Sequence, residues 1–171
     1  NKCILTFYIP EMELFIARLL NRCTTGAVRA AIDQIEHSLG TYNFLSVFEV
    51  CLTDRGSEFG KAEDIETGVN GIQRMSLYYC DPMRSNQKGG IENVHTMLRM
   101  IIPKGTVFKT LSQWDIKKAV NHINATPRQK LNGKTPYELA LNKWGPEILE
   151  ALQLRYVCPD DVTLSPKLLK K

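Results

Sequence analysis

Two carboxylates stand where the chain changes from one structural element to the next. Asp54 follows an apolar run that ends at Leu52, and Glu92 stands where a basic loop gives way to an apolar helix. They are 38 positions apart (92 − 54), with a strand-like segment between them. Hard divalent cations take oxygen ligands that converge from separate elements, and two such cations can clamp the reacting oxygens of a phosphodiester. The pair therefore indicates metal-dependent chemistry on DNA.

Each carboxylate also has a simpler interpretation when it is considered alone. An Asp close to a glycine is a common turn residue, which fits Asp54. A Glu in the first turn of a helix is favoured by the helix dipole, which fits Glu92. The combination of both positions with a basic loop before Glu92 favours a metal site.

The apolar pattern predicts the elements that would position these side chains. Strands are predicted at 3–9, 14–20, 45–52 and 76–80, the first two as a hairpin. Helices are predicted from a cap at Thr24 or Thr25 to about residue 39, at 62–72, 91–102 and 113–124, from 136, and at 145–151. Trp114 and Trp144 are assigned to the core in preference to a role as base-stacking platforms. Strands separated by helices predict an α/β mixed sheet covered on both faces, with ligands at the carboxyl ends of strands, where Asp54 lies.

The net charge of +4 is distributed unevenly. Residues 1–83 carry 7 Lys and Arg against 11 Asp and Glu, and residues 84–134 carry 10 against 2. A segment this basic is typical of a surface that binds a polyanion, although it also fits a solvated loop and helix face.

Length and composition fit one ordinary globular domain of 171 residues with 43% hydrophobic content. The five cysteines have neither metal-ligand nor redox spacing, which favours small buried side chains in a reducing cytosol. No apolar run reaches the roughly 18 residues that a membrane span needs. We therefore expect a cytoplasmic protein without a membrane partner.

Several short motifs occur in an order that is specific to one protein family. They are Asp54-Arg-Gly-Ser-Glu-Phe59, Tyr79-Cys-Asp-Pro82, Asn86-Gln-Lys-Gly-Gly-Ile-Glu-Asn93, Leu98-Arg99, Pro103-Lys-Gly105, Asn124-Ala-Thr-Pro-Arg-Gln-Lys130 and Gly133-Lys-Thr-Pro-Tyr-Glu138. Over residues 1 to about 140 the chain resembles the integrase core of insertion-sequence transposases, which are similar to retroviral integrases.

The resemblance implies a ribonuclease H-like fold, with the catalytic core at 1–140 and a helical or irregular extension at 141–171. It implies a triad of two Asp and one Glu that holds two Mg²⁺ (or Mn²⁺) ions, in which Asp54 matches the second acid and Glu92 the third. The implied reaction is hydrolysis at the transposon end, followed by attack of the freed 3′-hydroxyl on target DNA. The implied partners are transposon and target DNA and further copies of the chain, most simply as a dimer at the bacterial nucleoid.

One part of the family pattern has no counterpart in this sequence. In the family the first Asp lies on a strand before the hairpin at 3–20, and Asp33 lies on the wrong element, in mid-helix. We therefore expect an N-terminally truncated fragment that is inactive alone, or a decayed copy. That first strand is central in this fold, so we expect strand swapping, dimerisation through the open edge, or a strand supplied in trans.

Further residues are expected to contact DNA. Gln87 and Lys88 lie beside glycines that allow close approach to a backbone, and Arg99 suits a phosphate or, equally, a surface salt bridge. The predicted DNA-binding set is Arg84, Gln87, Lys88, Asn93, Arg99, Lys104, Arg128, Lys130 and Lys134.

Two other functions stay open from the sequence. A non-catalytic DNA-binding or assembly module of a degenerate transposase would bind DNA through 84–134 in a salt-dependent manner, without a metal effect. A nuclease of the same fold would use only water as the nucleophile, so the reaction products would distinguish it from a transposase.

Overall fold

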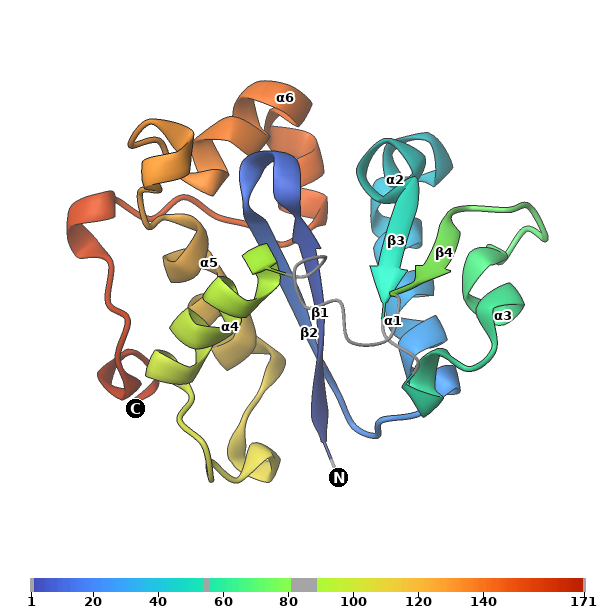
Figure 1. Ribbon diagram of the computed structural model, residues 1–171, viewed down its shortest axis with the longest axis horizontal. Helices are drawn as coiled ribbons and strands as arrows, with labels where there is room; N and C mark the ends of the chain where they lie inside the picture. Colours follow the sequence, from blue (N-terminus) through green and yellow to red (C-terminus); the bar gives the residue numbers. More distant parts are fainter. Residues whose placement is uncertain (1, 54–55, 81–88, 171) are drawn as a thin grey trace. The chain divides into compact units, whose positions relative to one another are not determined.

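The computed structural model describes residues 2–53, 56–80 and 89–170. The chain forms two compact units (Figure 1). The first comprises Asn1–Cys3 and Leu20–Gln87, and the second comprises Ile4–Leu19 and Lys88–Lys171. Both units combine helices with short strands, so the predicted α/β class is confirmed.

The first unit is built around a parallel pair of strands. Its described helices and strands are α1 (Thr25–Leu39), α2 (Thr41–Phe48), β3 (Val50–Thr53), α3 (Ala62–Glu66) and β4 (Ser76–Tyr79). In the pair, Val50 lies opposite Ser76 and Thr53 lies opposite Tyr79. Parallel neighbours require a crossover connection, and α3 lies on it. Strand β4 confirms the predicted strand at 76–80 except for Cys80.

The strand predicted over 45–52 is wrong for residues 45–48, which form the end of α2. The buried side chains of α2 are Phe44, Val47 and Phe48, which recur at helical spacing. A short apolar run cannot be assigned to a strand or a helix from periodicity alone. Gly40, at a φ of 76°, separates α1 from α2.

The helix predicted over 62–72 is also too long, because α3 ends at Glu66. Gly71 has a φ of 77°, a left-handed conformation that glycine adopts without steric cost. The chain turns there, so that Thr67 and Gln73 form an antiparallel bridge.

A buried arginine connects the elements of the first unit. The Arg74 side chain is fully buried and forms ion pairs with Asp33 and Glu36 of α1. Its Nε donates a 2.8 Å hydrogen bond to the carbonyl of Ile65 in α3. Charge-assisted hydrogen bonds of this kind compensate the cost of burying a guanidinium. Asp33 thus takes part in a structural ion pair.

The second unit consists of a hairpin and helices. Its described helices and strands are β1 (Cys3–Ile9), β2 (Leu14–Leu20), α4 (Gly89–Ile101), α5 (Gln113–Asn124) and α6 (Pro136–Ala151). The first residue of β1 and the last of β2 belong to the first unit. A four-residue connection can join only antiparallel neighbours, so the predicted hairpin is confirmed.

Local capping signals set the starts of α5 and α6 as predicted, whereas α4, predicted at 91–102, begins at Gly89 and ends at Ile101. Ser112 and Asp115 form a capping box at the start of α5, and Thr135 and Glu138 form another at the start of α6. Gly145, at a φ of 79°, kinks α6 before Pro146, so the predicted helix at 145–151 is the segment after the kink. Residue 140, the predicted boundary between the catalytic core and the C-terminal extension, falls within α6.

The strands of the described residues form two separate two-stranded sheets, β1–β2 and β3–β4. One continuous sheet of the ribonuclease H type stays a prediction. Among the same residues, no helix has the length and apolar character needed to cross a membrane.

Candidate functional site

Glu92 lies in the first turn of α4, where its side chain is exposed. The partial positive charge of a helix N-terminus favours a carboxylate at this position. Among the described residues, the Glu92 carboxylate has neither a hydrogen bond nor an ion pair, so its oxygens are available to a ligand. Asp54, the other predicted metal ligand, lies outside the described residues.

The helix that carries Glu92 packs closely on β1. A Cβ atom at Gly90 would overlap the ring and hydroxyl oxygen of Tyr8, so only glycine fits there without a shift. One turn further along, His95 Nε2 lies 3.1 Å from Thr6 Oγ1 at hydrogen-bond distance. The His95 ring also meets the Phe15 ring edge-on, with the ring centres 6.2 Å apart. These contacts hold the first turns of α4 on the hairpin.

The described residues contain no group of three or more His, Cys, Asp or Glu side chains arranged to hold a metal ion. The cysteines are all free thiols, four of them half-buried and Cys23 exposed. The expectation that the cysteines are small buried side chains therefore needs correction for Cys23, which lies between the polar residues Arg22 and Thr24.

Arg128, a predicted phosphate contact, is only 4% exposed. Its Nη2 donates a 3.0 Å hydrogen bond to the Ile123 carbonyl, and its Nε lies 3.5 Å from Glu13 Oε2. Burial lowers the pKa of Arg128, while Glu13 and Tyr8 oppose this shift. Burial and the Glu13 charge raise the pKa of Tyr8 to about 12, against the opposing effect of Arg128. A DNA contact would require the guanidinium to leave this position.

Two amide side chains of α5 occupy the free edge of β2. Asn124 accepts a hydrogen bond from the Phe15 N–H (2.9 Å) and donates one to the Phe15 carbonyl (2.7 Å). Gln113 Oε1 accepts a 2.8 Å hydrogen bond from the Leu19 N–H. An unpaired strand edge must be satisfied or covered, and Asn124 and Gln113 do so here.

The exposed members of the predicted DNA-binding set lie on α4 and in the connecting segments between α4 and α6. They are Asn93, Arg99, Lys104, Lys130 and Lys134. Arg84, Gln87 and Lys88 lie outside the described residues. The five exposed side chains are accessible to DNA, and their contact with DNA stays a prediction.

Trp114 was assigned to the core by the sequence, but it is 62% exposed. The buried stripe of α5 includes Ile116, Ala119, Val120 and Ile123. At 100° per residue, Trp114 lies about 180° from Ile123 on the helix circumference. The helical period therefore places Trp114 on the outer face of α5. There, Nζ of Lys117 lies 5.6 Å from the centre of the Trp114 ring.

No protein-family model matches the chain. The chain is 35% identical over 85 residues to the transposase for insertion sequence element IS4351 of Bacteroides fragilis, a match that covers 50% of this chain and 25% of that protein. It is 30% identical over 86 residues to the IS1086 transposase of Cupriavidus metallidurans, with 50% of this chain and 24% of that protein covered.

A third similar protein is the transposase InsI for element IS30A of Escherichia coli, which is 32% identical over 88 residues. This match covers 50% of the chain and 21% of InsI. The matched segment therefore spans a quarter or less of the length of these transposases. Half of the chain is similar to insertion-sequence transposases.

Proposed function

We propose that the chain is part of a transposase of the integrase superfamily, which cleaves DNA at a transposon end and joins the freed 3′-hydroxyl to target DNA. The observation that carries this proposal is the similarity to insertion-sequence transposases over half of the chain. The order of the short motifs from Asp54 to Glu138 supports it. A ribonuclease H-like sheet and self-association of the chain belong to the same proposal.

In this proposal Asp54 and Glu92 are metal ligands. Carboxylate oxygens are the donors that Mg²⁺ and Mn²⁺ prefer, and Glu92 fits because its exposed carboxylate has no partner among the described residues. When bound, the ions would stabilise negative charge on the reacting phosphate oxygens. Gly90 and His95 position the helix that carries Glu92, through Tyr8 and Thr6 respectively.

The exposed cations have a supporting role in the proposal. Lys130 and Lys134 lie near each other in the segment before α6 and would hold DNA phosphates. Asn93 and Arg99 follow Glu92 on α4. Contacts to phosphates position the DNA but carry no sequence information. Recognition of a particular transposon end would therefore depend on other residues.

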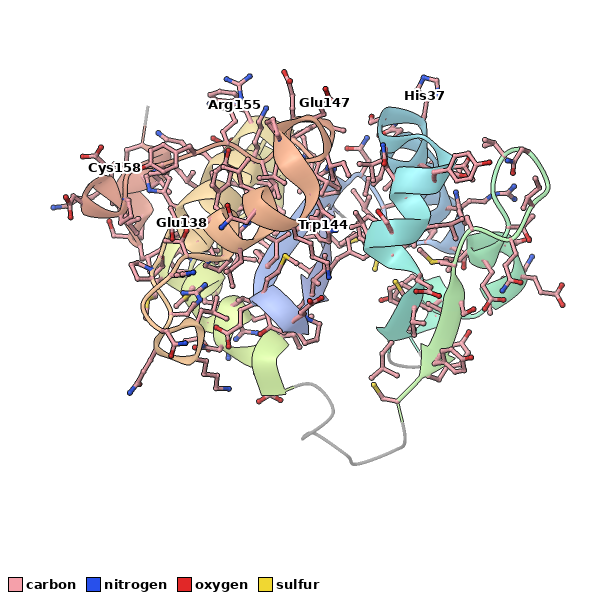
Figure 2. The ribbon with its side chains drawn as sticks, turned by 90° about the horizontal axis from the view of Figure 1, so that it is seen from above. His37, Glu138, Trp144, Glu147, Arg155 and Cys158 are labelled. Atoms are coloured by element: carbon pink, nitrogen blue, oxygen red, sulfur yellow. The ribbon has the colours of Figure 1, made fainter. Side chains whose placement is uncertain are left out.

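The first test is the melting temperature with and without Mn²⁺. We expect Mn²⁺ to raise the melting temperature of the parent chain, because a ligand that binds only the folded state stabilises it by roughly 2.7 kcal/mol at a hundredfold excess over its Kd. Asp54→Asn and Glu92→Gln should lose this rise. Glu147→Gln, a matched change at an exposed acid of α6 (Figure 2), should keep it.

The second test measures strand transfer in a longer transposase that contains this chain and a third carboxylate. Either substitution should abolish strand transfer there, and near-normal transfer by either variant would refute the assignment. Salt-dependent DNA binding that is indifferent to metal, without strand transfer, would instead support a non-catalytic module.

A further inference from the structure

The second unit carries an exposed tryptophan beside three cations that lie outside the predicted DNA-binding set. Trp114 is in the first turn of α5, with Lys117 one turn later and close to its ring. Arg18 of β2 and Arg155, which follows α6, contribute the other two positive charges. Figure 2 shows the Arg155 side chain projecting outward from its segment.

Local contacts hold the Arg18 side chain and the backbone of Arg155 in place. Arg18 donates hydrogen bonds to the carbonyls of Ala17 (2.9 Å) and Leu152 (3.0 Å), which hold its guanidinium in place. The Arg155 N–H donates a 3.0 Å hydrogen bond to Oδ1 of Asn121. Asn121 follows Lys117 by one turn on α5, so one face of α5 leads from the tryptophan to Arg155.

The positive charge of this cluster is not compensated by a nearby carboxylate. Arg18, Lys117 and Arg155 form no ion pair with another described residue. Burial, followed by the charges of Arg155 and Arg18, lowers the pKa of Lys117. Burial lowers the pKa of Arg18 to about 10, which leaves it charged at neutral pH.

We propose that Trp114, Lys117, Arg18 and Arg155 form a binding site for a single DNA strand. Lys117 and Arg155 contact successive phosphates, Arg18 adds positive potential, and an unpaired base stacks on the exposed face of Trp114. Proteins that bind single strands combine a positive groove with aromatic side chains in this way, because every base has a face that can stack. The proposal rests on the proposed function only in taking DNA as the nucleic acid.

The test is fluorescence anisotropy with a labelled oligothymidylate at several salt concentrations. Trp114→Ala should weaken binding by roughly tenfold, the effect expected for one stacked base, and Trp114→Phe should restore most of the affinity. The double variant Lys117→Ala/Arg155→Ala should lower the slope of log affinity against log salt by about 0.7 for each removed cation. Lys167→Ala, which removes an exposed lysine elsewhere in the unit, should bind like the parent.

The parent should also bind the single strand more tightly than a duplex of the same length. Parental affinity in Trp114→Ala, an unchanged salt slope in the double variant, or a preference for the duplex would overturn the proposal. Melting temperatures of all variants verify that each is folded. Strand transfer and the Mn²⁺ effect are measured separately, so a failure of this site and a failure of the proposed function give different results.

Discussion

Residues of the recognised motifs differ in what their side chains contact. Glu92 and Lys130 are exposed and available to a ligand, whereas Asn124 and Arg128 are buried and bind other parts of the second unit. The motifs therefore contain exposed side chains together with side chains that hold the fold. Substitutions of the second kind should lower stability before they change any activity.

The pair of Glu13 and Arg128 provides the clearest example. We expect Glu13→Gln to lower the free energy of unfolding by about 3 kcal/mol, because it leaves a buried guanidinium without its counter-charge. Nε and Nη1 of Arg128 already lack hydrogen-bond partners, so the remaining groups cannot compensate. Urea denaturation measures the loss.

A matched control lies in the same turn. Glu11→Gln breaks the ion pair between Glu11 and Lys143, in which both side chains are largely exposed. Exposed pairs contribute about 0–1 kcal/mol, so this variant should unfold close to the parent. If the two substitutions lower the free energy of unfolding equally, the ion pair between Glu13 and Arg128 does not behave as a buried pair.

Cys51 on β3 should react slowly with iodoacetamide. Burial raises the pKa of its thiol from 9.0 to about 11, so that roughly one thousandth of it is thiolate at pH 8. Because the folded-state pKa is raised, the stabilisation from Cys51 is present below pH 9 and is lost as the pH rises to about 11. Mass spectrometry of labelled peptides should show the exposed Cys23 modified first, and equal labelling rates would contradict the burial argument.

Helix α5 contacts the hairpin through the amide of Asn124. We expect Asn124→Ala to lower the free energy of unfolding by about 3 kcal/mol, since it leaves the buried N–H and carbonyl of Phe15 unpaired. Asn124→Asp keeps an acceptor for the N–H but places a second carboxylate oxygen against the carbonyl. Exchange of the Phe15 amide proton should therefore be faster in the Ala variant than in the Asp variant.

Helices with strong local signals could be predicted from the sequence, and elements that depend on distant contacts could not. Thr135, Pro136 and Glu138 fix the start of α6 by chemistry within four positions. The end of α2 could not be assigned, because its apolar side chains fit a buried strand equally well. The position of Glu92 in a first turn was likewise predictable, whereas the burial of Arg128 depends on Glu13, 115 positions away (128 − 13).

The β3–β4 sheet of the first unit has one exposed apolar face. Val50, Leu52 and Tyr78 are 63%, 50% and 58% exposed. Val50 and Leu52 alternate along β3, and Leu52 pairs with Tyr78 in register, so the three side chains share a face. Parallel strands are normally covered on both faces, and a two-stranded sheet has little stability by itself. A second copy of the chain is the partner expected from the proposed self-association.

We therefore expect concentration-dependent dimerisation that involves this face. Leu52→Lys should weaken the dimer in sedimentation velocity, because a charged side chain would have to lose its water at an apolar interface. Val69→Lys is the control, since Val69 is 71% exposed in the same unit but lies outside the β3–β4 pair. The thermal stability of both variants should match that of the parent under conditions where all are monomeric. If the parent stays monomeric at every concentration, or if Val69→Lys weakens association as much as Leu52→Lys, this face is not the dimer interface.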